Sequence, residues 1–302
     1  MMIEFDGRVA IVTGAGGGLG KQHALALAAR GARVLVNDLG GARDGSGGSG
    51  GAAQLVVDEI RAAGGQAIAN SASVSDFAAV QAMVQQALDT WGRVDVLVNN
   101  AGILRDKSFA KMDMEDFRLV LDVHLMGAVY CCKAVWPAMT AQKYGRIVMT
   151  TSSSGLYGNF GQSNYGAAKM ALVGLMQTLS IEGAKNDIRV NCLAPTAATR
   201  MTEGLMSEEV LAALKPEAVV PAMLVMVSES APTRTILCAG AGTFEAAHIT
   251  MTQGVHIGMS GDAPELLAAK LAEVTNRHGD TVPMSGSAQG TNEVGKFMAN
   301  KQ

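Results

Sequence analysis

Two side chains near the middle of the chain, Tyr165 and Lys169, have the types and the spacing that proton transfer requires. They lie four positions apart in a segment with helical periodicity, so they project from one face of the expected helix. A phenol has a pKa of about 10, and a nearby ammonium group lowers that pKa because it stabilises the phenolate. The pair therefore indicates general acid–base catalysis, although the same spacing is also common on the surfaces of ordinary helices.

A serine at the end of an apolar run could assist this pair. Ser152 follows residues 146–151, which predict a strand, and it precedes Tyr165 by thirteen positions. Its hydroxyl group would hydrogen-bond a substrate oxygen and stabilise a developing alkoxide. Ser153 and Ser154 are adjacent, so the residue types alone do not choose among the three, and a plain polar strand end is the preferred explanation of Ser154.

A glycine-rich turn, residues 13–20, reads TGAGGGLG and joins the apolar residues 9–12 to a helical pattern over residues 21–30. Glycines at such a junction let the backbone turn sharply and approach a pyrophosphate, and the free N–H groups at the helix start attract the anion. The strand–turn–helix setting predicts a dinucleotide site rather than a purely structural turn. The residues expected to hold the dinucleotide here are Gly14, Gly18, Leu19 and Gly20.

An acidic residue, Asp38, ends the next expected strand. A carboxylate there accepts hydrogen bonds from the adenosine ribose hydroxyls and repels a 2′-phosphate. Neither Arg33 at the start of the strand nor Arg43 in the following loop offsets that repulsion, so we expect NAD rather than NADP. That loop, residues 40–51, holds seven glycines and is either part of the adenosine site or a bare linker.

These residues must be positioned by alternating strands and helices. Near-continuous apolar strands between helical patterns predict a doubly wound parallel α/β sheet with helices on both faces, and a ligand site beyond the carboxyl ends of the strands. Asp113, with Asp116 at capping-box spacing, predicts the start of the fourth helix. The expected strands are residues 9–12, 33–37, 66–70, 94–99, 146–151, 189–194 and 235–239, and the expected helices include 54–63, 77–91, 115–142, 163–185 and 217–228.

The order and spacing of four motifs resemble the short-chain dehydrogenase/reductase family over about residues 7–242. The motifs are the glycine turn, NNAG at residues 99–102, Ser152, and the pair Tyr165 and Lys169. The stretches 36–41, 100–106 and 157–162 resemble, more narrowly, the dehydrogenase units of the type 2 peroxisomal multifunctional enzymes and their stand-alone bacterial relatives. The resemblance implies a Rossmann fold, favours Ser152 over its neighbours, and implies activity on (3R)-hydroxyacyl-CoA thioesters.

The resemblance also implies roles for residues outside the catalytic trio. Lys169 would hold the nicotinamide ribose as well as serve Tyr165. His124 stands where the family usually has an asparagine, and it could act in a water-mediated proton relay or simply pack in the helix. The remaining positions that the resemblance brings to the cofactor are Ser73 and Val74 near the adenine, Asn100, and Ala197, Ala198 and Thr199 along the nicotinamide and diphosphate.

Composition excludes several classes of protein. The net charge is −3 with no basic run, so nucleic-acid binding has little support. No apolar run approaches the length of a membrane span, and residues 1–6 do not resemble a secretory signal. The four cysteines, Cys131, Cys132, Cys192 and Cys238, have no metal-binding spacing, so we expect no metal and a reduced, cytoplasmic protein.

The chain is expected to be one dinucleotide-binding domain, residues 1–242, with a C-terminal extension, residues 243–302. The extension predicts one helix over residues 264–277 and a loop over residues 285–291. It is too short for an ordinary domain, so it should pack on the body or on a neighbouring subunit. The expected helices 115–142 and 163–185 carry more apolar positions than one sheet face needs, which predicts a homodimer or homotetramer.

The leading hypothesis is an NAD-dependent oxidoreductase that interconverts a secondary alcohol and a ketone, most simply a (3R)-hydroxyacyl-CoA and its 3-oxoacyl-CoA. Within the same family, the alternatives are a reductase of 3-oxoacyl carrier-protein thioesters and a steroid alcohol dehydrogenase. A non-catalytic nucleotide-binding protein is the alternative from another class. The complete set of Ser152, Tyr165 and Lys169 argues against it.

Overall fold

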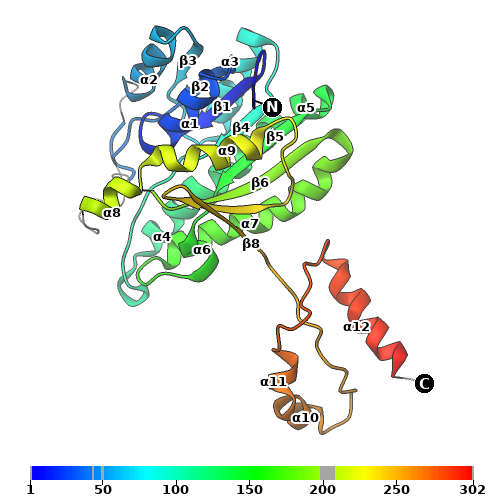
Figure 1. Cartoon of the computed structure of the whole chain (residues 1–302). Helices are drawn as coiled ribbons and strands as arrows, with labels where there is room; N and C mark the ends of the chain where they lie inside the picture. Colours follow the sequence, from blue (N-terminus) through cyan, green and yellow to red (C-terminus); the bar gives the residue numbers. More distant parts are fainter. Residues whose placement is uncertain (1, 43, 49–50, 198–207, 301–302) are drawn as a thin grey trace. The chain divides into compact units, whose positions relative to one another are not determined.

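The structure is a computed structural model that describes residues 2–42, 44–48, 51–197 and 208–300 (Figure 1). Its contacts divide the chain into two units, Met1–Ala246 and Ala247–Gln302. The division falls four residues after the expected start of the extension at residue 243.

The first unit is built on one eight-stranded sheet with the order β3-β2-β1-β4-β5-β6-β7-β8. The pairs from β3 through to β7 are all parallel, so the expected doubly wound parallel sheet is confirmed. The central residues of β1, β2, β4 and β5 are apolar and buried, as strands covered on both faces require. The strands are β1 Val9–Thr13, β2 Arg33–Asn37, β3 Gln66–Asn70, β4 Val96–Asn99, β5 Gly145–Thr150, β6 Ile188–Pro195, β7 Ile236–Gly240 and β8 Thr243–Ala247.

The last strand, β8, was not predicted. Two residues, Ala241 and Gly242, join it to β7, and both have positive φ, at 48° and 75°. A two-residue turn with positive φ at both positions is the type I′ hairpin, which reverses the chain into an antiparallel neighbour. The side chains of β8 are mostly exposed, so the segment lacks the apolar run that marks the other strands.

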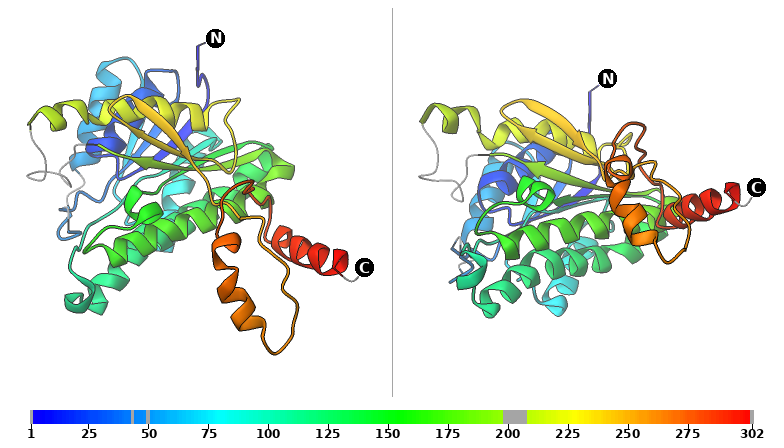
Figure 2. Two further views of the ribbon diagram at one scale, coloured as in Figure 1. Left: turned by 60° about the horizontal axis from the view of Figure 1, so that its bottom comes forward. Right: turned by 90° about the horizontal axis from the view of Figure 1, so that it is seen from below.

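Helices cover both faces of the sheet (Figure 2): α1, α2 and α9 lie on one face, and α3, α5 and α7 on the other. Asp76 caps α3 by accepting hydrogen bonds from the amides of Ala78 and Ala79, and Gly92 ends it with φ at 77°. The helices are α1 Gly18–Ala28, α2 Gly51–Ala62, α3 Phe77–Trp91, α4 Met114–Leu121, α5 Gly127–Gln142, α6 Ser153–Tyr157, α7 Ser163–Gly183, α8 Glu208–Ala213 and α9 Val220–Val227, with 3₁₀ turns at Phe109–Lys111, Ala184–Asn186 and Pro216–Val219.

The expected fourth helix, residues 115–142, is interrupted by a π-helical turn, Asp122–Met126, between α4 and α5. The predicted capping box is wrong. Asp113 precedes α4 but makes no capping hydrogen bond, because its carboxylate accepts from Lys107 at 2.8 Å. The Asp116 carboxylate likewise accepts from Arg105 at 3.1 Å.

Among the described residues, Met114–Gln142 is the one stretch whose length and composition would also suit a membrane span. The expectation that no run approaches that length was wrong, because only Lys133 interrupts residues 123–142 with a Lys, Arg, Asp or Glu. Cys131, Val135 and Met139 are nevertheless fully buried, and α5 packs on α3, β4 and β5. That packing is typical of a core helix.

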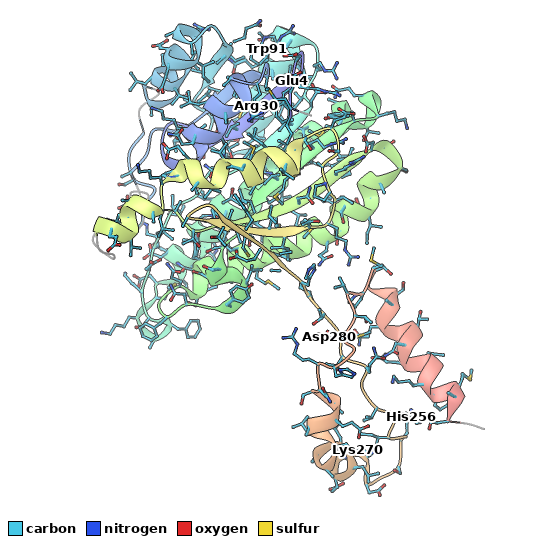
Figure 3. The ribbon with its side chains drawn as sticks, viewed as in Figure 1. Glu4, Arg30, Trp91, His256, Lys270 and Asp280 are labelled. Carbon is cyan, nitrogen blue, oxygen red and sulfur yellow. The ribbon has the colours of Figure 1, made fainter. Side chains whose placement is uncertain are left out.

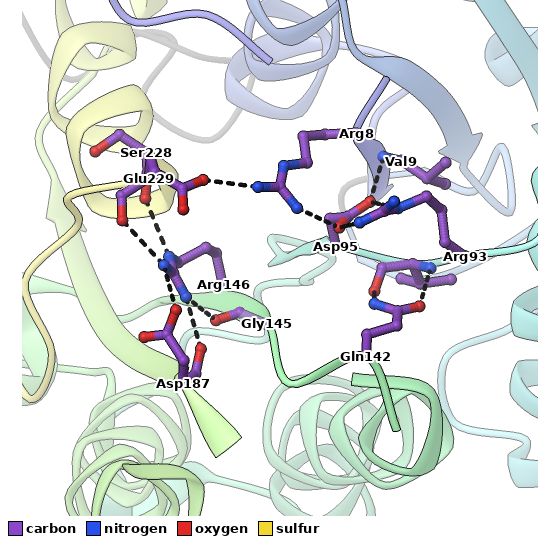
Figure 4. Close-up of polar contacts among 11 residues, drawn as sticks. Arg8, Val9, Arg93, Asp95, Gln142, Gly145, Arg146, Asp187, Ser228 and Glu229 are labelled. Atoms are coloured by element: carbon purple, nitrogen blue, oxygen red, sulfur yellow. Dashed lines mark hydrogen bonds and ion pairs between the residues drawn. The ribbon is translucent and has the colours of Figure 1, made fainter. Parts of the chain in front are cut away.

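The amino ends of the strands are connected by a cluster of charged groups in which Arg146 and Asp95 are buried (Figure 4). Arg146 is fully buried and donates to the Asp187 carboxylate at 3.0 Å and to the carbonyls of Ser228 and Glu229. Nearby, Arg8 donates to the buried Asp95 at 3.1 Å. This cluster lies at the edge of the sheet opposite to the carboxyl ends of the strands. The charged contacts that join the strands are therefore separate from the edge where a ligand site is expected.

The second unit contains α10 Ala263–Ala269, α11 Leu271–Val274 and α12 Ser287–Ala299, with an antiparallel bridge between Met251 and Thr281. The single helix expected over residues 264–277 is instead broken at Lys270 (Figure 3), which leaves the helical conformation with φ −99° and ψ 9°. The loop expected over residues 285–291 is wrong, because α12 begins at Ser287. A Gln289–Glu293 hydrogen bond of 2.8 Å supports its first turns.

Candidate active site

The glycine turn between β1 and α1 has the close contacts that only glycine permits. Gly14 has φ at 61°, and a Cβ atom there would lie 2.7 Å from the Cα of Ala101. At Gly20, a Cβ atom would lie 2.2 Å from the carbonyl oxygen of Gly14. These positions therefore keep the turn tight against the end of β4 and leave its outer surface to backbone N–H groups.

The start of α1 offers these N–H groups to a ligand. The residue before the helix, Gly17, has extended backbone and no side chain to cap the first amides, and the first turn has no acidic residue. Uncapped amides at a helix start form an anion site. The turn, which contains Gly14, Gly18, Leu19 and Gly20, thus has a shape and free N–H groups that fit the pyrophosphate of a dinucleotide.

Asp38 lies directly after β2, next to this turn. Its carboxylate accepts hydrogen bonds from the amides of Gly16 and Gly40, each at 2.7 Å. A Cβ atom at Gly16 would lie 2.8 Å from the Asp38 Cγ, so glycine is required for this approach. The two amides hold the carboxylate in place, and its remaining lone pairs can accept from ribose hydroxyls.

Asn100 connects the glycine turn to β4. Its side-chain amide donates to the carbonyls of Thr13 at 3.1 Å and Gly14 at 3.0 Å, and the Thr13 hydroxyl accepts from the Asn100 and Ala101 amides. It therefore shapes the cofactor cradle from behind. Of the other residues expected near the cofactor, Ser73 is half-buried, Val74 and Ala197 are buried, and Ala198 and Thr199 lie outside the described residues.

The three predicted catalytic residues lie together at the carboxyl end of β5. Tyr165 and Lys169 are on α7, and the Lys169 Nζ lies 5.4 Å from the centre of the Tyr165 ring. Ser152 follows β5 and caps α6 by accepting from the Ser154 amide, and its hydroxyl interacts with the Tyr165 phenol, whose pKa it lowers. The structure therefore brings all three predicted residues together, and it gives Ser152, rather than Ser154, the contact with the phenol.

The electrostatics of the trio differ from the sequence-based expectation. Burial raises the pKa of Tyr165, and the group that lowers it is the Ser152 hydroxyl rather than Lys169. Burial also lowers the pKa of Lys169 to about 7, so its side chain is only partly charged at neutral pH. Its Nζ donates to the Thr150 carbonyl at 2.5 Å, which directs it past the phenol toward β5.

His124 lies in the π-helical turn and faces Tyr165. Its Nε2 is 3.0 Å from the Ile103 amide nitrogen and 2.8 Å from the Ile103 carbonyl oxygen, while Nδ1 has no partner among the described residues. Burial, followed by the charge of Lys169, holds the pKa of His124 well below its usual value. The side chains of His124 and Lys169 line a cavity of about 10 Å³, which is roughly the space that one water molecule requires.

Two features of this site were missed from the sequence. Gly102 is required by His124, because a Cβ atom there would lie 2.2 Å from the imidazole ring. The glycine of the NNAG motif was a signal that could have shown this. The π-helical turn, which places His124 here, has no comparable signal in the sequence.

The described residues contain no group of three His, Cys, Asp or Glu side chains that could hold a metal ion. Cys131, Cys132 and Cys192 are buried free thiols, and Cys238 is half-buried. Burial raises the pKa of Cys132 to about 12, so it remains a thiol at neutral pH.

The chain is similar in sequence and in structure to a multifunctional enzyme. The chain is 49% identical to the peroxisomal multifunctional enzyme type 2 of Drosophila melanogaster over 263 residues, which are 87% of this chain and 44% of that protein. The solved structure of that enzyme superposes with a TM-score of 0.81 at 38% identity and covers 99% of this chain and 50% of its own. The chain therefore spans about half the length of this relative or less.

Two further relatives match along most of their own length. The chain is 47% identical to a short-chain type dehydrogenase/reductase of Mycobacterium tuberculosis, and the aligned residues are 90% of this chain and 95% of that protein. A 7α-hydroxysteroid dehydrogenase, solved with NADH and 7-oxo glycochenodeoxycholic acid, superposes with a TM-score of 0.71 at 31% identity over 79% of this chain and 95% of its own. The short chain dehydrogenase family model matches residues 8–210, which include the glycine turn and the trio. The chain belongs to the short chain dehydrogenase family.

Proposed function

We propose that this protein oxidises a (3R)-hydroxyacyl-CoA thioester to the 3-oxoacyl-CoA with NAD. The observation that carries the proposal is the trio of Ser152, Tyr165 and Lys169 beside a glycine turn that fits a pyrophosphate. When it is bound, a nicotinamide dinucleotide supplies the hydride acceptor. This chain's residues bind and orient the alcohol and remove its proton.

Ser152 and Tyr165 share the substrate oxygen in this mechanism. The hydroxyl of Ser152 donates to that oxygen and stabilises the negative charge that develops on it. The Tyr165 oxygen accepts the substrate's hydroxyl proton while the phenol passes its own proton on to neighbouring groups. The hydride leaves the carbon that bears the hydroxyl group, so the alcohol loses one proton and one hydride and becomes a ketone.

Lys169 and His124 provide a route for that proton. A single water in the cavity that both side chains line would bridge Lys169 and the Nδ1 of His124, whose ring is neutral because of its burial. His124→Leu should slow the oxidation most at low pH, where deprotonation of the site limits the rate. An unchanged pH profile in that variant would show that His124 only packs in the helix.

Family membership supports a nicotinamide dinucleotide, and one structural relative holds NADH. The choice of NAD over NADP depends on Asp38. Its carboxylate lies beside the glycine turn, where a 2′-phosphate would meet its negative charge. Among the described residues, Arg33 lies at the opposite end of β2 and does not compensate.

The acyl-CoA substrate is supported by the multifunctional enzymes among the relatives and by the stretches 36–41, 100–106 and 157–162. A second candidate, a steroid alcohol, is supported by the 7α-hydroxysteroid dehydrogenase structure. The test is NAD reduction with a panel of (3R)- and (3S)-hydroxyacyl-CoA thioesters of several chain lengths, hydroxyacyl carrier-protein thioesters and hydroxysteroids. Preference for the (3R)-hydroxyacyl-CoA thioesters supports the proposal, and preference for a steroid or a carrier-protein thioester overturns it.

The assembly we propose is a homodimer or homotetramer in the cytoplasm. The surplus of apolar side chains on α5 and α7 is smaller than predicted from the sequence. Four of them are buried within the first unit: Val135, Met139, Leu172 and Met176. Exposed apolar side chains remain on α7, at Met170 and Ile181. None of the described residues 248–300 is buried, so the apolar side chains of the second unit require a partner surface.

A further inference from the structure

One connection in the first unit crosses the dinucleotide crevice. The sheet order places β1 between β2 and β4, and the glycine turn follows β1. Residues 42–46 follow β2, and residues 103–106 follow β4, both at the carboxyl edge. A contact between these two segments therefore passes over the end of β1, where the pyrophosphate site lies.

Arg105 makes that contact. Its Nε donates to the Asp44 carbonyl at 2.6 Å, and its Nη1 donates to the Asp116 carboxylate at 3.1 Å. Beside it, Gly45 lies against Ile103, because a Cβ atom at Gly45 would be 3.2 Å from the Ile103 Cγ2. One polar and one apolar contact thus join the two segments.

The segment that Arg105 contacts is called here the 42–46 turn, and the structure describes Ala42 and residues 44–46 of it. The Ala42 amide donates to the Ser46 carbonyl at 2.8 Å, and the Gly45 amide donates to the Ala42 carbonyl at 3.0 Å. The Asp44 carboxylate accepts from the amide and the hydroxyl of Ser46 at 3.0 and 2.6 Å. These bonds present the Asp44 carbonyl to the guanidinium group.

The backbone of Arg105 is connected to the catalytic helix. Its carbonyl accepts from the side-chain amide of Asn164 at 2.9 Å, and the Asn164 Oδ1 accepts from the Tyr165 amide at 2.7 Å. Asn164 is fully buried, so this connection is shielded from water. Arg105 therefore joins the 42–46 turn to the segment that positions Tyr165.

We propose that Arg105 is a positioning residue that holds the 42–46 turn across the dinucleotide crevice and thereby slows release of bound NADH. The inference rests on the proposed function. Arg105 acts through the turn rather than as a phosphate ligand, because Asp116 already pairs with its charge. The open cavity between the segments, about 360 Å³, also presents the carboxylates of Asp44 and Asp106, which would repel a phosphate.

The test compares Arg105→Ala with Lys107→Ala. Lys107 is a matched control, because it also pairs with Asp116 from the same segment but makes no hydrogen bond or ion pair with the described residues of the 42–46 turn. In the free protein, amide hydrogen exchange of residues 44–48 should rise in Arg105→Ala and stay unchanged in Lys107→Ala. NADH release, followed by fluorescence after rapid mixing with excess NAD, should be roughly tenfold faster in Arg105→Ala alone, as the loss of a charge-assisted hydrogen bond predicts.

Asp116→Asn separates the turn from a direct charge effect. If Arg105 acts by holding the turn, Asp116→Asn weakens the ion pair that fixes the guanidinium group. NADH release and amide hydrogen exchange of the turn should then become faster, but by less than in Arg105→Ala. If Arg105 instead binds a phosphate, freeing its charge slows release, and the inference is overturned. The inference is also overturned if the wild-type protein binds NADH and the Arg105→Ala variant releases NADH at the same rate as the wild type. A wild-type protein that binds no NADH refutes the proposed function itself, whatever the exchange experiment gives.

Discussion

The imidazole ring of His124 lies edge-on to the phenol ring of Tyr165, with centroids 5.2 Å apart and an interplanar angle of 87°. His124 also contacts the backbone of Ile103, directly after the NNAG motif. Tyr165 is therefore packed against a side chain that is itself fixed by the loop after the NNAG motif. In the proposed mechanism, proton transfer and cofactor binding depend on the same set of contacts.

Tyr165→Phe should lower turnover by roughly a thousandfold, because it removes the proton acceptor, whose contribution is typically 10²–10⁴-fold. The NADH dissociation constant should change little, since the phenol contributes little to holding the dinucleotide. Steady-state NAD reduction and NADH fluorescence titration measure the two effects. Retention of more than about a tenth of the activity would place the base elsewhere.

Lys169→Ala should lower both turnover and NAD affinity, because Lys169 serves the ribose and the proton path together. Stability provides a second readout. The pKa of Lys169 is about 7 in the folded protein and 10.5 ordinarily, so the unfolded state binds more protons between these values and the lysine's contribution to stability rises with pH in this window. Melting temperatures from pH 7 to 10 should lose that rise in Lys169→Met. A variant with less turnover but unaltered NAD affinity would argue against contact with the ribose.

Asp38→Ala should weaken NAD binding and narrow the preference over NADP. Removing the carboxylate deletes a charge-assisted hydrogen bond to the ribose, worth on the order of 1.5–3 kcal/mol, and removes the repulsion of a 2′-phosphate. The ratio of kcat/KM for the two cofactors is the measurement. Asp38→Asn, which keeps the size of the side chain, is the matched control for shape. A wild-type enzyme that prefers NADP would reject the assignment.

His23→Leu should protect the protein from acid. His23 is fully buried on α1, both ring nitrogens lack partners among the described residues, and burial lowers its pKa from 6.5 to about 4. Between these values the unfolded state binds the extra proton, so stability falls as the pH falls, by about 3 kcal/mol in total. Chemical denaturation at pH 7 and pH 4.5 should show a smaller loss in the variant, and an equal loss in both proteins would contradict the prediction.

Deleting residues 258–302 should lower oligomer stability or raise the substrate KM, with little change in NADH affinity. The reason is that the apolar side chains of α10 and α12, such as Leu267 and Met298, are exposed within their own unit and need a partner. Light scattering and steady-state kinetics of both proteins test this. A monomeric intact protein whose kinetics survive the deletion would reject it.

The sequence predicts the parts of this protein in which local pattern and spacing agree with tertiary structure. The bounds of α3 were predicted correctly because Asp76 and Gly92 mark its ends. The proximity of Ser152, Tyr165 and Lys169 was predicted because Ser152 follows a strand and the other two residues share one face of a helix. Capping at Asp113 failed because the Lys107 side chain, six residues earlier in the chain, binds its carboxylate.

Other features depend on partners that no local pattern reveals. The Ser and Gly residues around α12 are typical of a loop, yet the segment is helical. The contact of Arg105 with Asp44 joins residues 61 positions apart. The lowered pKa of Lys169 follows from burial that its residue type does not suggest.

The Arg146 cluster has a consequence for how this protein can change over evolution. The Tyr144 ring lies between the guanidinium groups of Arg8 and Arg146, at 3.7 and 4.1 Å, and the surrounding carboxylates and carbonyls join segments preceding β1, β4 and β6. These contacts use none of the residues proposed to bind the substrate or the cofactor. Loops at the carboxyl edge can therefore acquire substitutions that alter substrate preference while the scaffold retains its anchoring, and laboratory selection for new alcohols should succeed there and fail at Arg146.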